Sequence, residues 1–389
     1  MIGEKKMKKW KLAAVLGFCF LALTGCGNSV KAPETDPEEA SVEDPEAYPE
    51  PEVSANEAAA TGLVAANGYA SSYGRERERK DGMVRSYLTG KWVDESIGDR
   101  RPVAVMLNNI EDAQPMSGVS AADVIYECVV EGSLTRMMGI FENYDDLDKI
   151  GSVRSCRNYF VYYALELDAV YAHYGQSAYA VSLLEQDFVD NLSGLAGIGG
   201  TVFYRTSDRV APHNAYASGK GINEGIRRMN YRTGYREDYK GKFTFAKDDD
   251  TIVPDVESFD ATMIKPGYLI NQPWFEYKEE DGKYYRYQYG GPQIDDCNGE
   301  QLSADNIILQ YSSWEEVDNK GYLGFDCHAG GEMAYITKGK AEKGYWIRYD
   351  GDQGSVRYYD STGHEIVLNQ GKTWICIIQD TYADKVEIR

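Results

Sequence analysis

The sequence predicts an α+β protein with an N-terminal α/β domain and a mostly antiparallel, β-rich C-terminal domain. In the first half, short apolar runs alternate with segments whose apolar residues recur at helical period, which is typical of strands alternating with helices. In the second half, helical period is absent, and short alternating runs are separated by turn-like stretches. Hydrophobic residues make up 43% of the 389 residues, which is enough for a sizeable core.

The first residues have the three parts of a bacterial lipoprotein signal. Five lysines precede an apolar stretch at residues 12–23, which is too short to span a membrane comfortably. Leu-Thr-Gly-Cys then ends at Cys26, in the order of aliphatic residue, two small residues and cysteine that lipid attachment requires. We predict that Cys26 carries lipid and that the protein is held at the extracytoplasmic face of the cell membrane. An ordinary secretory signal with a chance cysteine is the alternative.

An acidic stretch rich in proline and alanine follows the signal, and Lys31 is the only base in residues 31–57. Such a segment buries too little surface to fold, so we expect a disordered tether, with partner binding as the alternative. The formal net charge of the chain is −21, which argues against nucleic-acid binding because that needs clustered Lys and Arg. The expected segments are a signal peptide at 1–25, the tether at 26–86, the α/β domain at 87–241 and the β-rich domain at 242–389.

Strand and helix patterns alternate through the first domain. Its first apolar run, PVAVML, is followed by two asparagines, as expected for a buried strand that ends in a turn. Expected strands lie at residues 102–107, 123–130, 137–143, 169–173 and 201–204, and expected helices lie at 156–167, 178–185 and 221–229.

Short alternating runs fill the second domain, and tyrosine, which strand faces favour, is abundant there. Turn sequences such as DGK and DGD separate the runs, so we expect a sandwich or a partial barrel. Expected strands lie at residues 284–289, 306–311, 333–337, 345–349, 356–359 and 373–379.

Guanidinium and imidazole groups follow several of the expected strands of the first domain, and Arg154 and Arg157 lie in a turn that we expect at residues 154–157. In an open α/β sheet, loops at the carboxyl ends of strands gather around one crevice, so a shared pocket is expected. Several arginines that converge in an acidic protein suggest an anion, because guanidinium forks match phosphate and carboxylate. The candidate ligand-binding or catalytic residues are Arg154, Arg157, His173, Ser177, Arg205, Arg209, His213 and Asn214.

Each candidate also has a structural interpretation. The arginines could pair with acidic residues and so lock the packing of helices on the sheet. His173 and His213 could act as acid or base near neutral pH, or could be buried histidines held by hydrogen bonds. Cys156, between two arginines, could have a lowered thiol pKa or could be a passive buried residue. The acidic residues that would pair with the arginines are Glu127, Glu131, Glu166 and Asp168.

Metal and cofactor motifs are not found in the sequence. There is no HExxH, no CxxC and no GxSxG, and the glycine-rich GIGG at residues 197–200 precedes a strand instead of following one. The acidic runs at 145–148 and 248–250 could bind calcium but are more typical of solvated loops. We therefore expect no metal and no cofactor.

Several sequence motifs occur in order along both domains. The first domain contains RRPVAVMLNN, ADVIYE, IGSVRSCRNYF, ALELDAVYAHYGQS and APHNAY, and the second contains DNIILQY, GKAEKGYWIR and LNQGKTWICII. In these motifs the chain resembles the YerB-like bacterial lipoproteins, a two-domain family of unknown function. The resemblance covers nearly the whole chain after the tether. The resemblance implies an extracytoplasmic lipoprotein with no settled activity and no established cofactor. Cys156 departs from the small residue, such as alanine, that the family leads us to expect, so no catalytic thiol is implied.

Two functions are consistent with these residues. The favoured one is a lipid-anchored protein that binds an anionic cell-envelope ligand bearing phosphate or carboxylate groups, or a protein partner. The alternative is a cell-envelope hydrolase or transferase in which His173 or His213 is the acid or base and arginines stabilise developing charge. Binding is favoured because no nucleophile, paired-carboxylate or metal motif is visible, but whether the protein is an enzyme stays open.

Overall fold

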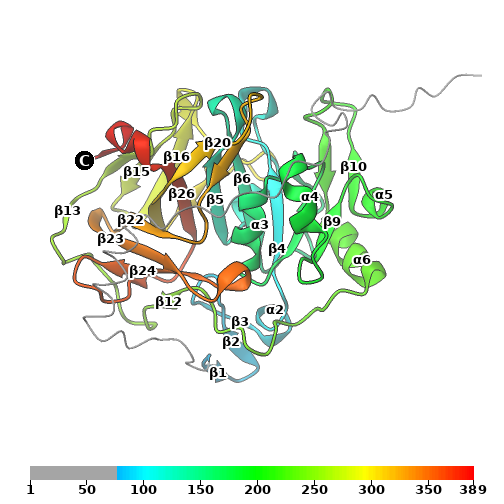
Figure 1. Ribbon diagram of the computed structural model, residues 1–389. Coiled ribbons are helices and arrows are strands. Elements are labelled where there is room, and N and C mark those ends of the chain that lie inside the picture. Colours follow the sequence, from blue (N-terminus) through cyan, green and yellow to red (C-terminus); the bar gives the residue numbers. More distant parts are fainter. Residues whose placement is uncertain (1–76) are drawn as a thin grey trace, which may run out of the picture. The chain divides into compact units, whose positions relative to one another are not determined.

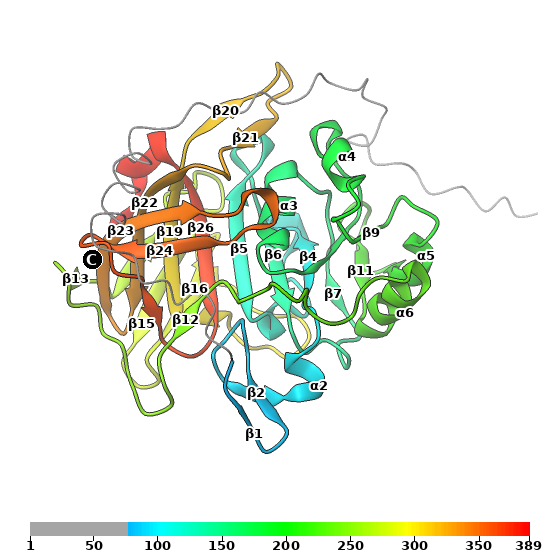
Figure 2. The same ribbon diagram turned by 60° about the horizontal axis from the view of Figure 1, so that its bottom comes forward.

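A computed structural model describes residues 77–389; the predicted signal peptide, Cys26 and most of the predicted tether lie outside this range. The described chain begins with a small sheet at one edge of the ribbon (Figures 1 and 2). The sheet contains β1 (Arg79–Lys80), β2 (Met83–Arg85) and β3 (Trp92–Asp94), and α2 (Glu95–Gly98) follows it. Among the helices from residue 77 onward, none is long and apolar enough to cross a membrane.

One eleven-stranded sheet runs through both halves of the described chain (Figure 1). Its order is β13-β23-β22-β19-β26-β5-β6-β4-β8-β9, with β24 paired to β23. The first half supplies β4 (Val103–Leu107), β5 (Val124–Val129), β6 (Thr135–Phe141), β8 (Val170–His173) and β9 (Asn191–Ser193). The second half supplies β13 (Phe259–Asp260), β19 (Asn306–Ser312), β22 (Gly330–Thr337), β23 (Lys340–Arg348), β24 (Val356–Asp360) and β26 (Thr373–Gln379).

The prediction that the second half is rich in β structure is confirmed, whereas the first half contains few helices and its strands do not form a uniformly parallel sheet. β4, β8 and β9 run parallel, whereas β6 is antiparallel to both β4 and β5. The short connection from β5 to β6 explains this, because a parallel crossover needs about a dozen residues or more. The expected helices correspond to α3 (Asn158–Leu165), α4 (Ala178–Leu184) and α6 (Gly219–Met229).

The two halves meet at a parallel pair of strands, β26 and β5, where Trp374 lies opposite Ile125. A buried polar network reinforces this junction. Glu127 and Arg286 are both 0% exposed, and Arg286 Nη2 donates to Glu127 Oε2 at 2.6 Å. Asn271 Nδ2 donates to Glu127 Oε1 at 3.0 Å. Because a buried charge must be paired, this network binds the first half to the second.

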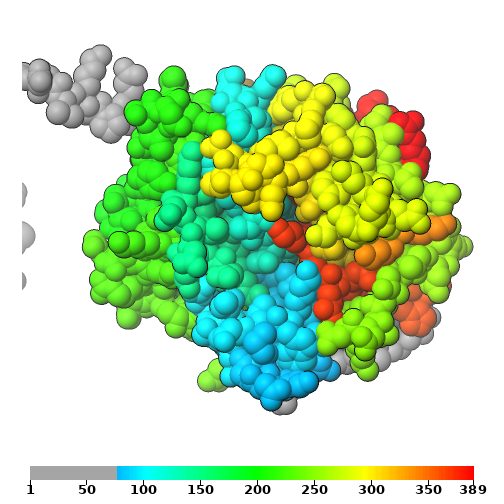
Figure 3. Space-filling view, turned by 180° about the vertical axis from the view of Figure 1, so that it is seen from behind, coloured from blue at the N-terminus to red at the C-terminus, as the bar shows by residue number. Residues whose placement is uncertain are grey.

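A second sheet belongs to the later half and is antiparallel throughout. It contains β14 (Met263–Lys265), β15 (Trp274–Lys278), β16 (Lys283–Gln288), β17 (Gly291–Pro292), β18 (Ser303–Ala304) and β27 (Glu387–Ile388). Figure 3 shows that the yellow chain around residue 295 lies against the first half. Asp295 there accepts hydrogen bonds from the backbone N–H groups of Gly118 at 2.9 Å and Ser120 at 2.7 Å.

The remaining elements are short. One three-stranded sheet contains β10 (Phe203–Arg205), β11 (Ala215–Ala217) and β7 (Ile150–Gly151), and α5 (Gly199–Val202) precedes β10. Two-stranded sheets pair β12 (Thr244–Phe245) with β25 (Val367–Leu368), and β20 (Trp314–Glu316) with β21 (Leu323–Phe325). The 3-10 helices are η2 (Glu111–Ala113), η3 (Val119–Ala121), η4 (Glu131–Ser133), η5 (Gly351–Gln353) and η6 (Asp380–Lys385).

Candidate functional site

The chain between β7 and α3 crosses the carboxyl ends of β4 and β8. Arg154 N–H donates to the Met106 carbonyl of β4 at 3.1 Å, and Tyr174 N–H, just after β8, donates to the Arg154 carbonyl at 3.1 Å. Cys156 forms an isolated bridge with Gln176 in the same region. The prediction of a turn at residues 154–157 is therefore wrong, because backbone pairing to both strand ends holds this segment extended up to the start of α3.

The extended backbone separates two of the candidate arginines. Side chains three positions apart in an extended segment point to opposite faces, so Arg154 and Arg157 diverge. Arg157 forms a two-pronged ion pair with Glu131, in which Nε and Nη2 each donate at 2.6 Å. The Arg157 side chain is only 3% exposed, and its guanidinium also lies 5.3 Å from the Tyr322 ring centroid. Arg157 is therefore part of the scaffold, as the structural interpretation of the arginines predicts.

Several of the other candidates do come together at the strand ends. We name this group the edge cluster: Asn108, Arg154, Tyr174, Arg205, His213 and Asn214. Arg205 ends β10 opposite Ala215 of β11, and its Nη1 donates to Asn214 Oδ1 at 2.8 Å. Its guanidinium carbon lies 4.6 Å from the centroid of the Tyr174 ring. Asn214 Nδ2 is fixed in turn by a 2.9 Å hydrogen bond to the Thr206 carbonyl. The Arg205 fork is thus oriented by an amide and an aromatic ring.

His213 contacts Asn108, the residue directly after β4. Asn108 Oδ1 accepts from the backbone N–H groups of Asn109 at 2.9 Å and Ile110 at 3.3 Å, which fixes the orientation of the amide. Its Nδ2 therefore faces His213 Nδ1, 3.0 Å away, and must be the donor. With Nδ1 accepting, the proton of the neutral His213 ring lies on Nε2.

Arg209 donates hydrogen bonds to the loop at residues 113–115. Its Nη1 donates to the Ala113 carbonyl at 2.6 Å, and its Nη2 donates to the Pro115 carbonyl at 2.7 Å. The adjacent carboxylate is that of Asp208, whose pKa is lowered first by hydrogen bonding to Thr206 and then by the charges of nearby cations that include Arg209. Arg205 and Arg209 thus bind neutral oxygens directly, so their hydrogen bonds leave their charges unneutralised.

His173, Ser177 and Cys156 lie inside the protein. His173 is 0% exposed, its Nδ1 lies 2.7 Å from the Gly175 carbonyl, and burial lowers its pKa. Ser177 is 2% exposed and precedes α4. Burial raises the pKa of Cys156 to about 12, so the idea of a thiol activated by its flanking arginines is wrong. These three residues are not part of the edge cluster.

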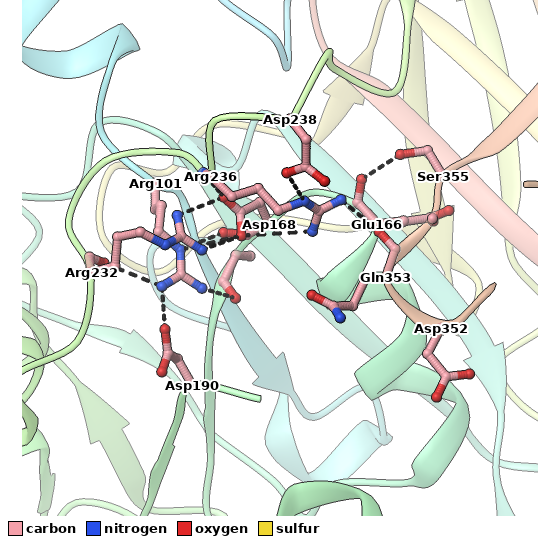
Figure 4. Close-up of polar contacts among 12 residues, drawn as sticks. Arg101, Glu166, Asp168, Asp190, Arg232, Arg236, Asp238, Asp352, Gln353 and Ser355 are labelled. Atoms are coloured by element: carbon pink, nitrogen blue, oxygen red, sulfur yellow. Dashed lines mark hydrogen bonds and ion pairs between the residues drawn. The ribbon is translucent and has the colours of Figure 1, made fainter. Parts of the chain in front are cut away.

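A separate group of arginines surrounds Asp168 (Figure 4). We name Asp168, Arg101, Arg232 and Arg236 the Asp168 cluster. Arg232 donates to both carboxylate oxygens of Asp168, at 2.7 and 2.8 Å, and Arg236 N–H donates to Oδ2 at 2.8 Å. Arg101 Nε donates to the Asp168 carbonyl at 2.7 Å. Asp168 is thus a scaffold carboxylate, as the structural interpretation holds, but its arginines are ones that sequence reasoning did not select.

Sequence reasoning also missed Asn108 and Tyr174 as members of the edge cluster. Both directly follow the last residue of a strand, β4 or β8, which is the signal that could have identified them. Over residues 77–389 there is no group of three or more His, Cys, Asp or Glu side chains that could hold a metal ion. The five cysteines of that range are all free thiols.

Comparison with known proteins places the chain in a family. The pattern described as "Protein of unknown function (DUF3048) N-terminal domain" matches residues 88–232, and the pattern of the corresponding C-terminal domain matches residues 264–375. The chain belongs to the DUF3048 family. The resemblance to YerB-like proteins is thereby confirmed, and every residue of the edge cluster lies in the match to the DUF3048 N-terminal domain.

One DUF3048 relative has a solved structure. The "Putative lipoprotein YerB" of Bacillus subtilis (strain 168) is 28% identical to this chain over 304 residues, which are 78% of this chain and 88% of the relative. The crystal structure of the YerB protein from Bacillus subtilis superimposes with a TM-score of 0.68 at 26% identity, covering 78% of this chain and 99% of that one. The two proteins share a fold. Neither the name of the family nor that of the relative assigns an activity to either protein.

Proposed function

We propose that this chain is a lipid-anchored protein at the extracytoplasmic face of the cell membrane, where it binds an anionic cell-envelope ligand through the edge cluster. The lipobox that ends at Cys26 and a relative named as a lipoprotein support the anchor. The ligand would carry a phosphate or carboxylate group, as teichoic acids and peptidoglycan stem peptides do.

The geometry of Arg205 carries this proposal. One guanidinium nitrogen donates to Asn214 and the guanidinium carbon lies over the Tyr174 ring, so the group is oriented in the absence of a ligand. Its other N–H groups make no hydrogen bond to any residue from 77 to 389, and the side chain is exposed. An oriented, exposed guanidinium that lacks a carboxylate suits two-pronged binding of phosphate or carboxylate.

The neighbours of Arg205 favour the same ligand class. Arg209 adds a second cation, whose guanidinium donates to the backbone carbonyls of Ala113 and Pro115. In a chain with a net charge of −21, such a patch attracts anions locally.

The enzyme alternative gains less from this geometry. A general base needs a ring nitrogen that can accept a proton from the substrate, and Nδ1 of His213 already accepts from Asn108. His173, the other proposed acid or base, is fully buried. Because Asn108 engages Nδ1, His213 fits proton abstraction poorly.

Calorimetric titration of the mature chain with inorganic phosphate, citrate and a muropeptide mixture tests the proposal. Arg205→Ala should weaken binding by about 10-fold or more, because hydrogen bonds between charged groups contribute about 1.5–3 kcal/mol. Arg205→Lys should recover only part of the loss, since lysine keeps the charge without the fork.

Arg227→Ala is the matched control, because Arg227 is 70% exposed on α6 and paired with Glu224. The proposal would be contradicted if the Arg205 and Arg227 variants bound the anions with equal affinity, or if the parent chain bound none of the three anions. The enzyme alternative would instead be supported if the parent chain turned over the muropeptides and His213→Ala abolished this turnover without changing affinity.

A further inference from the structure

A second candidate site lies away from the edge cluster, where the N-terminal sheet meets the chain around β12 (Figure 2). A pocket of about 210 Å³ opens there, and its walls include Arg85, Tyr87, Lys240, Phe243, Phe245 and Lys247. All six of these residues fall outside the two regions that match the DUF3048 patterns. The pocket is therefore independent of the function proposed for the edge cluster.

One wall of the pocket is apolar and closely packed. The Phe243 and Phe245 rings lie 5.8 Å apart at 66°. Phe245 packs on Gly90, where a Cβ atom would lie 2.4 Å from Phe245 Cγ, and the positive φ of Gly90 also favours glycine. Tyr87 is held by a 3.2 Å hydrogen bond from its hydroxyl to the Tyr239 carbonyl. This wall offers aromatic surface to a ligand.

The residues that line the pocket include more bases than acids. Five lining residues are Lys or Arg and only one, Glu78, is acidic, although the whole chain carries a net charge of −21. Arg85 is already paired, with Asp248 at 2.5 Å and Glu78 at 3.2 Å. The ammonium groups of Lys240 and Lys247 form no ion pair or hydrogen bond within the described chain, and both residues are exposed. These two lysines are available to an anion.

We propose that this pocket binds an amphipathic anion, in which an aromatic or branched apolar group lies next to a carboxylate, phosphate or sulfonate. The apolar part would contact Tyr87, Phe243 and Phe245, and the acid would meet Lys240 and Lys247. The volume is sufficient, since a cavity of about 150 Å³ accommodates benzene. Ligand sites commonly combine such an apolar lining with a few placed polar groups.

Two sources can supply this chemistry. One is a free ligand of the cell envelope. The other is the acidic stretch of this chain at residues 31–57, which carries ten Asp and Glu residues along with Tyr48 and Val53. That stretch precedes Arg77, the first described residue, which itself lines the pocket.

Fluorescence titration of the mature chain with 8-anilinonaphthalene-1-sulfonate tests the site, because this probe joins aromatic rings to a sulfonate. Replacing Lys240 and Lys247 together with glutamine should weaken binding about 5-fold or more. The matched control replaces Lys220 and Lys343, exposed lysines on α6 and β23, and should leave affinity unchanged. The uncharged analogue 1-anilinonaphthalene should not distinguish the two double variants.

Equal affinities of the two double variants for the sulfonate probe would overturn the proposal. Arg205→Ala should leave probe binding unchanged, so failure here is separable from failure of the edge-cluster proposal. A chain whose Asp and Glu residues at 31–57 are all replaced by Asn and Gln then identifies the source. Probe binding that is about 5-fold tighter identifies the acidic stretch as the natural occupant, and unchanged binding identifies a free ligand.

Discussion

The Asp168 cluster and the edge cluster both contain several arginines, but their partners differ. In the Asp168 cluster, Arg232 binds both oxygens of a carboxylate that is only 4% exposed. In the edge cluster, Arg205 binds the neutral oxygen of Asn214 and lies against an aromatic ring. The partner of an arginine therefore distinguishes a scaffold from a candidate binding site more clearly than the presence of arginine does.

Burial explains why the partners differ. A carboxylate as buried as Asp168 is unstable unless cations and hydrogen-bond donors compensate its charge, so its arginines are committed to it. Arg205 is exposed, so water solvates its charge and no counterion is needed. Asn214 then orients the guanidinium without neutralising it, which leaves it able to bind an anion.

Asp168→Asn should produce the largest effect among variants that test this comparison, because it makes the Asp168 cluster resemble the edge cluster. Removing one partner of a buried ion pair costs about 3–5 kcal/mol. Arg232 is 41% exposed and can be rehydrated, so we expect a loss of about 2–4 kcal/mol in the free energy of unfolding, measured by urea denaturation.

Asp238→Asn is the control for this variant. Asp238 contacts Arg236 at 3.1 Å but is 82% exposed, so its removal should cost less than about 1 kcal/mol. Equal losses in the two variants would show that burial of the carboxylate does not set the strength of the Asp168 cluster.

A smaller effect is expected from Glu142, a buried carboxylate that forms no ion pair with any residue from 77 to 389. It is 3% exposed, and burial raises its pKa to about 7; burial likewise raises the pKa of Asp123 to about 6. The folded protein therefore binds these protons more tightly than the unfolded chain does. The stabilisation from these two carboxyl groups is complete below pH 4, where they are protonated in both the folded protein and the unfolded chain. It is lost as pH rises through 6 and 7.

Glu142→Gln should reduce the fall in the free energy of unfolding between pH 5 and pH 7 by up to about 2 kcal/mol. Urea denaturation at several pH values measures the free energy of unfolding of both chains. Part of the slope should remain, because Asp123 is unchanged and burial also raises the pKa of Glu342 to about 7. A Glu142 variant whose stability falls with pH as steeply as that of the parent chain would contradict the assignment.

The strands of both halves could be predicted from local patterns, but their long-range pairing could not. The apolar run that forms β26 indicates a strand at 373–379, yet nothing local shows that Trp374 lies opposite Ile125 in parallel. Such pairing depends on surfaces that meet only after the chain folds. The same limit applies to Glu127, which sequence reasoning paired with a nearby arginine and the structure pairs with Arg286.

Predicting the candidate site failed where the backbone conformation was misjudged. Treating residues 154–157 as a turn brings Arg154 and Arg157 together, whereas the extended segment directs them to opposite faces. Of the candidates on this segment, Arg205 and Asn214 contact each other, because β10 and β11 form an antiparallel pair that keeps residues close in sequence close in space.

Asn214→Asp should have the smallest effect on stability and is the most direct test of the comparison, because it gives Arg205 a carboxylate. The amide oxygen of Asn214 already lies 2.8 Å from Arg205 Nη1, so an aspartate can form an ion pair there. A partly buried ion pair with an exposed arginine contributes about 1 kcal/mol, which offsets the lost amide donor to the Thr206 carbonyl, so stability should change by less than about 1 kcal/mol. Calorimetric affinity for phosphate should nevertheless fall about as far as in Arg205→Ala, since the guanidinium is neutralised in place. Asn214→Ala removes the hydrogen-bond acceptor of Arg205 without adding charge, so it should lose less affinity for phosphate. An Asn214→Asp chain that binds phosphate as tightly as the parent chain would show that Arg205 does not hold the anion.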